Sequence, residues 1–414
     1  MTALHQVKVL QVIAPKYTTS FQCVGAECPD SCCSGWRVDI DKKTHRTYTK
    51  IVDPDLKPLF ASNLQRTRGT ESEARYAKIS LEPSTGDCPF LQQSICSIQK
   101  KLGEDKLSHT CFQYPRSTLE VGGVRQHSMT MSCPQAARLA LTNDDSMEFV
   151  STPINNRSDV IAKHSVLKLR ISPESINGIR FALIRLVRGK AIPLWQRLAA
   201  LGVVCELIGD FSANGKSSEL THIIEQFERT LSTESLSDVL DGQKADHASQ
   251  SVGLISVWKL KSFRGTSKRQ RLVQDEVLHG LGYGPDSSEV EPTAVVARYA
   301  DGLNIFEETL ATCPSLLENF VLNEMFREVF PFGSAEPIHH YRLMVVKYGV
   351  VRLMLAARCR YHQRALTFDE AIETIQVFSR LYEHAADFGE QVDKILSRLK
   401  LDSTADLYKF LKPA

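Results

Sequence analysis

Cysteine residues crowd the first third of this 414-residue chain, which contains eight of its 11 cysteines. Thiols gathered this densely need a metal, a disulfide partner or a redox role, because unpaired neighbouring thiols are readily oxidised. The eight residues that could do this chemistry are Cys23, Cys28, Cys32, Cys33, Cys88, Cys96, Cys111 and Cys133. Which of the three roles applies depends first on the redox compartment of the protein.

The first 21 residues indicate that compartment. They lack the charged segment, long apolar run and small-residue cleavage site of a secretory signal, so we expect a cytoplasmic protein. Thiols stay reduced in the cytoplasm, and disulfide scaffolds are usually much shorter than this chain. Metal ligation is therefore the predicted role of the eight cysteines.

The cysteine spacing favours an iron–sulfur cluster over zinc. Structural zinc sites usually contain Cys-x2-Cys pairs, and this chain has none. The gaps of four and three residues between Cys23, Cys28 and Cys32 are closer to the loops that wrap iron–sulfur clusters. Adjacent side chains diverge in an extended chain, so we expect one of Cys32 and Cys33 to face away and a distant thiol to complete the set. One cluster is favoured over two four-ligand sites, zinc or no metal.

The remaining cysteines, Cys205, Cys313 and Cys359, occur singly in helical context, where burial as small apolar side chains is expected. No phosphate loop, nucleophile elbow or His-Glu-x2-His helix is present. The radical S-adenosylmethionine spacing fails because Gly35 occupies the position of its third cysteine. The glycine-rich run over residues 277–284 lacks the surrounding strands and helices of a nucleotide-binding fold, and we interpret it as a helix-ending loop. The residues alone identify neither a catalytic group nor a cofactor pocket.

The composition is that of an ordinary soluble globular protein. The chain is 43% hydrophobic and 24% charged, with a net charge of +2, and its length suits roughly two or three domains. No apolar run approaches the roughly 18 residues that span a bilayer. Neither a nucleic acid nor a membrane is therefore expected as a partner. A basic and aromatic stretch over residues 258–271 is interpreted as a solvated face.

The elements that must position the cysteines change in character near residue 150. Before it the chain alternates short extended pieces, such as residues 36–40, with loops rich in Gly and Pro. After it long amphipathic helices follow, interrupted by a predicted flexible connection over residues 232–251. The predicted fold class is mainly α. A loop-rich, cysteine-cluster metal-binding domain over residues 1–150, with little continuous core, precedes a helical domain over residues 151–414.

Capping residues predict several helix boundaries in the second domain. Ser172 as N-cap and the following Pro predict a helix that ends at Gly189, and the next helix is expected to end at Gly209. Thr367 and Glu370 form a capping box before an apolar repeat with helical spacing. These helices would supply most of the apolar surface available for a core.

Several segments resemble the flagellin lysine-N-methylase family. In the first half they are residues 21–28, 31–37, 88–91, 96–98, Cys111 with Tyr114 and Pro115, and 132–134. In the second half they are residues 317–320, Asn323, Phe326 and 330–332. The cysteine elements are shared with a wider group of zinc- or iron-chelating proteins, so the helical half makes the resemblance to the methylase more specific.

The resemblance implies methyl transfer to lysine ε-amines of flagellin, with S-adenosylmethionine as donor, an iron–sulfur cluster of the 4Fe-4S type and substrate docking by the helical domain. Lysine attacks only as the neutral amine, and aromatic faces such as those of Trp36 and Tyr114 suit cationic groups. Packing against the metal site is the favoured role of these two side chains. The alternative function is a non-enzymatic zinc- or iron-binding interaction module.

Overall fold

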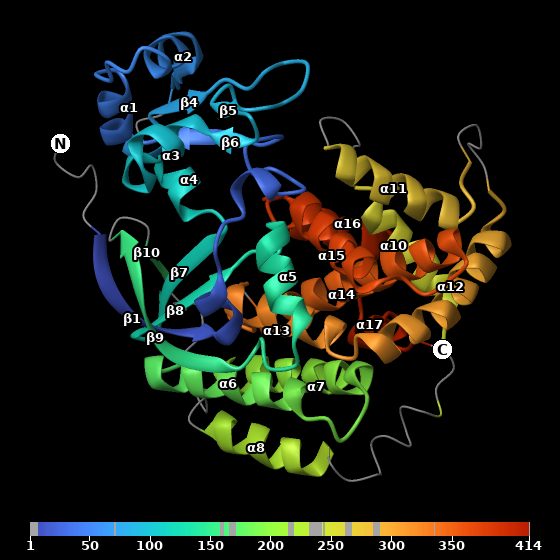
Figure 1. The fold of residues 1–414 in the computed structure, drawn as a ribbon. Helices are drawn as coiled ribbons and strands as arrows, with labels where there is room; N and C mark the ends of the chain where they lie inside the picture. Colours follow the sequence, from blue (N-terminus) through green and yellow to red (C-terminus); the bar gives the residue numbers. More distant parts are fainter. Residues whose placement is uncertain are drawn as a thin grey trace.

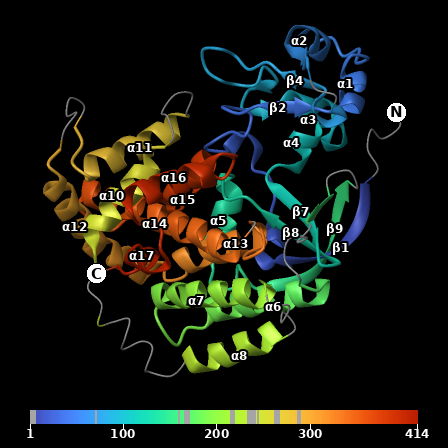
Figure 2. The same ribbon diagram turned by 180° about the vertical axis from the view of Figure 1, so that it is seen from behind.

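The computed structural model describes residues 7–69, 72–157, 161–164, 171–213, 219–231, 242, 245–260, 267–284, 290–334 and 336–413. These residues form a cysteine-rich lobe, a mixed sheet and a large helical body, with the lobe protruding from the other two parts (Figure 1, Figure 2). The connection predicted over residues 232–251 lies largely outside the described residues, and its last residues belong to a helix that begins at His247.

The cysteine-rich lobe contains short strands and short helices. Its strands are β2 (Val38–Ile40), β3 (Leu64–Arg66), β4 (Ala77–Ile79), β5 (Leu91–Gln92) and β6 (Ile95–Cys96). Its helices are α1 (Lys42–Tyr48), α2 (Leu56–Asn63), α3 (Ser97–Leu102) and α4 (His109–Gln113). The strands form an antiparallel sheet in the order β2-β4-β3 and a β5-β6 hairpin.

The lobe has an apolar core of its own, so the expectation of little continuous core was wrong. Tyr48, Phe60 and Phe90 are buried at its centre, and the Phe60 ring lies 4.3 Å from that of Tyr48 and 4.6 Å from that of Phe90, between ring centroids. Aromatic side chains bury much surface each, so three of them stabilise a small lobe in which the strands are very short.

The predicted mainly α class is confirmed, but a five-stranded mixed sheet was not predicted. Its order is β10-β7-β8-β1-β9. The strands are β1 (Val7–Pro15), β7 (Arg116–Val121), β8 (Val124–Met129), β9 (Phe149–Arg157) and β10 (Ile161–His164). β1 pairs antiparallel with all of β9, from Val7 opposite Arg157 to Pro15 opposite Phe149. Residue 150, the predicted domain boundary, therefore falls inside a strand of this sheet.

The helical body follows the capping signals. Its helices are α5 (Pro134–Thr142), α6 (Pro173–Arg188), α7 (Leu194–Ala213), α8 (Leu220–Leu231), α10 (His247–Trp258), α11 (Lys268–Gly280), α12 (Pro292–Thr312), α13 (Leu316–Arg327), α14 (Pro337–His362), α15 (Phe368–Tyr382), α16 (Phe388–Leu399) and α17 (Thr404–Lys409). Ser172 caps α6 and Thr367 forms the predicted capping box with Glu370. The predicted end of α7 at Gly209 was wrong, because packing of its buried face outweighs the roughly 1 kcal/mol that an internal glycine costs.

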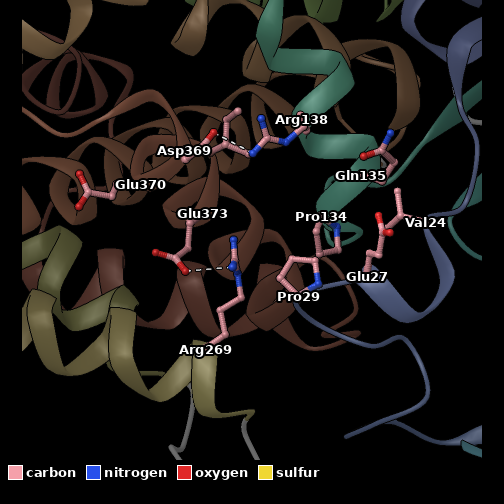
Figure 3. A pocket seen from close by; sticks show the side chains of 11 residues that line it. Val24, Glu27, Pro29, Pro134, Gln135, Arg138, Arg269, Asp369, Glu370 and Glu373 are labelled. Carbon is pink, nitrogen blue, oxygen red and sulfur yellow. Dashed lines mark hydrogen bonds and ion pairs between the residues drawn. The ribbon is translucent and has the colours of Figure 1, made fainter. Parts of the chain in front are cut away.

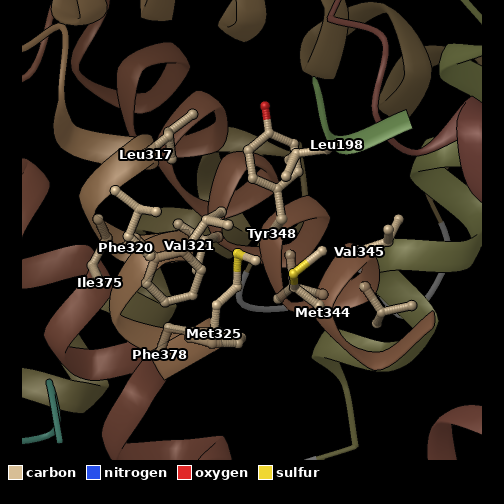
Figure 4. Packing of buried hydrophobic residues seen from close by; sticks show 14 of the residues in the cluster. Leu198, Leu317, Phe320, Val321, Met325, Met344, Val345, Tyr348, Ile375 and Phe378 are labelled. Carbon is tan, nitrogen blue, oxygen red and sulfur yellow. The ribbon is translucent and has the colours of Figure 1, made fainter. Parts of the chain in front are cut away.

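Helix α14 is buried along most of its length at the centre of the body. Met344, Val345 and Tyr348 belong to the same buried cluster as Phe320 and Phe378 from neighbouring helices, as Figure 4 shows. A Cβ at Gly280 would come 1.9 Å from a carbonyl oxygen of α14, so only glycine allows α11 to approach this closely. The run over residues 277–284 contains the end of α11 at Gly280, as predicted.

The three single cysteines of the body are buried in the apolar core as predicted, with exposed fractions of 0%, 8% and 0% for Cys205, Cys313 and Cys359. Among the described residues, no helix is long and apolar enough to cross a membrane.

Candidate active site and cysteine cavity

Five of the eight clustered cysteines line one cavity of about 50 Å³ in the lobe. They are Cys32, Cys33, Cys88, Cys96 and Cys111. Apolar side chains of the lobe core complete the walls, together with Trp36 and Tyr114. Cys32 and Cys33 both line this cavity, whereas one of them was expected to face away from the ligand set.

Local backbone structure brings these thiols together. The N–H of Cys88 donates to the carbonyl of Cys33 over 2.7 Å, which holds two distant segments side by side. Cys96 lies on the β5-β6 hairpin, whose turn residues Gln93 and Ser94 have positive φ values of 52° and 61°. Cys111 lies in the first turn of α4, where its N–H donates to Ser108 Oγ over 3.3 Å.

The thiols of the cavity influence each other's protonation. Hydrogen bonding from Cys33 lowers the pKa of Cys96 to about 6, whereas hydrogen bonds to Cys32 and Cys96 raise the pKa of Cys33. Burial raises the pKa of Cys88 to about 11 and that of Cys111 to about 12. Bound metal requires thiolates, so metal binding at these cysteines would release protons.

The donor set fits a thiolate-ligated centre in kind. Soft thiolates select iron–sulfur clusters and zinc. Within the described ranges, however, no group of three or more His, Cys, Asp or Glu side chains is arranged to hold a metal ion. The ligand set therefore remains a prediction, with the five cavity cysteines as the best-placed candidates.

The other three clustered cysteines lie outside the cavity lining. Cys133 is buried at the N-cap of α5, Cys28 is half-buried with its thiol 3.4 Å from the carbonyl oxygen of Asp30, and Cys23 is exposed. Burial raises the pKa of Cys133 to about 12, with smaller contributions from Cys28 and Cys32. The eight cysteines thus divide into five at the cavity and three beside it.

Helix α15 anchors the segment that carries Cys28, Cys32 and Cys33. Arg380 donates to the carbonyl oxygens of Ser31 and Ser34 over 2.9 and 2.8 Å. Gln376 donates to Asp30 Oδ2 over 3.0 Å and to the carbonyl of Ser132 over 2.9 Å. These hydrogen bonds hold the cysteine segment against the helical body, so residues of both parts contribute to this site.

Three aromatic rings meet where the lobe contacts the body. The ring centroid of Trp36 lies 5.2 Å from that of Tyr114 and 5.9 Å from that of His384, and the last two are 6.3 Å apart. Trp36 and Tyr114 also line the cysteine cavity, and His384 follows α15. We name Trp36, Tyr114 and His384 the aromatic junction. Such faces can hold a cationic group through cation–π attraction.

A chain of hydrogen bonds leads from the aromatic junction into the body. Ser132 Oγ lies 3.0 Å from His384 Nε2 and 3.2 Å from Tyr114 Oη. Thr130 Oγ1 lies 2.9 Å from Ser132 Oγ and also donates to a carboxylate oxygen of Glu383. The Glu383 side chain is only 1% exposed, and burial raises the pKa of its carboxyl to about 7. The aromatic junction is thus linked to a buried group that titrates near neutral pH.

A second cavity of about 410 Å³ lies beside the cysteine segment (Figure 3). Its walls come from the segment itself and from α5, α11 and α15. They contain four carboxylates and two guanidinium groups, from Glu27, Asp369, Glu370, Glu373, Arg138 and Arg269. Arg138 pairs with Asp369 over 2.7 Å, and Arg269 pairs with Glu373 over 3.1 Å. This cavity shares no lining residue with the cysteine cavity, and we name it the acidic cavity.

Trp36 and Tyr114 were named from the sequence, but His384, Glu383 and Thr130 were not. The pattern around Glu383 resembles the solvent-facing end of an amphipathic helix, and nothing local indicates that its carboxylate is buried against α13. Of the hydrogen-bonded residues, only Ser132 could have been singled out from the sequence, because it directly precedes Cys133.

The profile of the FliB lysine N-methylase C-terminal domain matches residues 180–410, more than half of the chain. Glu383 and His384 fall inside the matched region, whereas all eight clustered cysteines precede it. The class defined by this match is that of the protein-lysine methyltransferases. The chain belongs to the FliB lysine N-methylase family.

Individual relatives agree with this assignment. The chain is 28% identical over 177 residues to the flagellar biosynthetic protein FliU of Salmonella muenchen, across 42% of this chain and 100% of the relative. It is 30% identical over 142 residues to the lysine-N-methylase of Salmonella typhimurium strain LT2, and equally to that of Salmonella choleraesuis strain SC-B67. Those two matches span 34% of this chain and 35% of each methylase. No solved structure matches the chain.

Proposed function

We propose that this chain methylates lysine ε-amines of flagellin in the cytoplasm, with S-adenosylmethionine as donor and an iron–sulfur cluster, of the 4Fe-4S type, at the cysteine cavity. The observation that carries the proposal is that Trp36 and Tyr114 belong to both the cysteine cavity and the aromatic junction. Family membership supports lysine methylation, and the name of the FliU relative supports a flagellar substrate.

The aromatic junction suits the side chain of the substrate lysine. Rings of Trp36 and Tyr114 attract an ammonium while their apolar edges exclude water. Lysine has a reference pKa of about 10.4, so it must lose a proton before it attacks a methyl group, and partial desolvation lowers that pKa. When bound, S-adenosylmethionine supplies an electrophilic methyl group. The residues of this chain contribute orientation and removal of the proton.

The acidic cavity suits the part of the protein substrate that flanks the lysine. Three of its four carboxylates, those of Asp369, Glu370 and Glu373, are paired with arginines, and Glu27 supplies the fourth, in a cavity walled by both the cysteine segment and the helical body. A segment that carries further lysines would be attracted to such walls. Docking there would hold the substrate next to the cysteine segment, which extends the role first assigned to the helical domain.

The test is intact-mass analysis of flagellin co-produced with and without this chain. The proposal predicts mass increments of one methylene for each methyl group added, together with iron and acid-labile sulfide in the anaerobically purified protein. No mass increment from metal-loaded protein supplied with S-adenosylmethionine would instead favour a non-enzymatic metal-binding module. Zinc at full occupancy without iron or sulfide would refute the cluster assignment alone.

A further inference from the structure

We infer that Ser132, Thr130 and Glu383 form a proton relay that takes the proton from the substrate ammonium at His384 into the helical body. The inference rests on the proposed lysine methylation, and it adds the proton acceptor that the reaction needs. It stands on a continuous series of contacts from the aromatic junction, where His384 is exposed, to a carboxylate that is 1% exposed.

Each step of the relay conserves atoms and charge. The N–H bond of the ammonium breaks as one nitrogen of neutral His384 gains a proton, and Nε2 passes its own proton to Ser132 Oγ. Ser132 then gives its hydroxyl proton to Thr130, and Thr130 gives its own to the Glu383 carboxylate. The lysine becomes neutral and Glu383 becomes a carboxylic acid. After the product leaves, the same steps in reverse return the proton to solvent.

Charged groups lie near both ends of the relay, at Glu383 and at His384. At the inner end Glu383 contacts Arg327 of α13 over 3.2 Å, which favours its ionised form. Burial of Glu383 strongly disfavours its ionised form, and the neighbouring Glu324 disfavours that form further. Glu324 is itself paired with Lys347 over 2.7 Å. At the outer end, burial and the charges of Arg327 and Arg380 lower the pKa of His384, against a smaller opposite effect of Glu328. The lowered pKa favours the neutral form of His384, which can accept a proton.

Both hydroxyl groups of the relay are fixed by the fold. The N–H of Thr130 donates to the carbonyl of Pro115 over 2.9 Å, and Thr130 is 7% exposed. Ser132 is 1% exposed, and its carbonyl accepts from Gln376 over 2.9 Å. The two hydroxyl groups that lie between the exposed His384 and the buried Glu383 are therefore shielded from solvent.

The test compares Thr130→Val, which keeps the shape and removes the hydroxyl, with Thr130→Ser, which keeps the hydroxyl. For the wild type and Thr130→Ser we expect kcat for methylation to rise with pH through a midpoint near 7, where Glu383 ionises. For Thr130→Val and Glu383→Gln we expect loss of that midpoint and a fall in kcat of about 100-fold or more, the usual contribution of a positioned base. A wild-type profile in Thr130→Val would overturn the relay while leaving the methylase function intact. An inactive wild type would instead refute the proposed function and the relay with it.

A second readout does not depend on activity. Folding raises the pKa of Glu383 above its ordinary value, so the folded state binds this proton more tightly than the unfolded state. The melting temperature of the wild type should therefore fall relative to that of Glu383→Gln as pH rises from 5 to 8. A difference in melting temperature that does not change with pH would show that Glu383 does not titrate in this range, and would also overturn the relay.

Discussion

The cysteine-rich lobe and the helical body contain the same side chain in two different environments. In the body, Cys205, Cys313 and Cys359 are scattered through the apolar core, on or beside three different helices. In the lobe, five thiols surround one cavity and shift each other's pKa. A buried thiol among hydrocarbon groups only fills space, whereas thiols that share a cavity can share a ligand. Grouping in space therefore distinguishes the two roles, although burial alone does not.

The strongest test of this comparison is serine substitution in both regions. Cys33→Ser and Cys96→Ser should each reduce iron and sulfide to background, because a hydroxyl is a poor substitute for a soft thiolate. Cys359→Ser, at a fully buried position in the body, should keep the metal and lose only packing energy. Metal analysis of the purified variants checks this. Equal metal loss in both sets would mean that the cavity does not define the ligands.

How much of the fold could be predicted from the sequence depends on how far apart in the chain the interacting residues lie. Capping at Ser172 and Thr367 uses neighbours three residues away, so the sequence predicts the start of α6 and of α15 correctly. The pairing of β1 with β9 joins residues about 140 positions apart, such as Val9 and Asn155, and no local pattern reports it. The sequence therefore predicts helices well and misses the central sheet.

The candidate site shows the same division. The eight cysteines are recognisable as a group because they are close in sequence and share one chemistry. Glu383 and Thr130 are 253 positions apart, and their contact depends on how α15 packs against the segment after β8. Burial gives Glu383 its raised pKa, and burial of a single carboxylate cannot be read from an isolated sequence.

A smaller effect is expected where the two regions are joined. Arg380→Ala removes three charged hydrogen bonds to the cysteine segment and leaves Asp30, whose side chain is 2% exposed, without its cation. We expect a loss of about 3 kcal/mol in the free energy of unfolding, within the range for breaking a buried pair. Arg37→Ala is the matched control, because Arg37 is 54% exposed and its pair with Asp39 is worth about 1 kcal/mol or less. Denaturant titration measures both, and equal losses would contradict the anchoring role of α15.

The smallest effect is expected at the acidic cavity. Glu27→Lys should raise KM for flagellin by roughly 2- to 5-fold without changing kcat, because a single exposed charge contributes about 1 kcal/mol or less. The control is Glu225→Lys on α8, where Glu225 is 41% exposed and does not line the acidic cavity. Steady-state kinetics at two ionic strengths should show that the change in KM shrinks with added salt. A fall in kcat would place Glu27 in the reaction itself rather than in docking.

The most direct test of methylation at the aromatic junction is the intact mass of flagellin after incubation with S-adenosylmethionine and metal-loaded protein, either wild type or Trp36→Ala/Tyr114→Ala. The central claim is that the aromatic junction beside the cysteine cavity is where lysine is methylated. Methylation at this junction predicts methylene increments with the wild type and an unshifted mass with the double variant, provided that the variant keeps its iron and sulfide. Methylation by the double variant at the wild-type rate would contradict the claim.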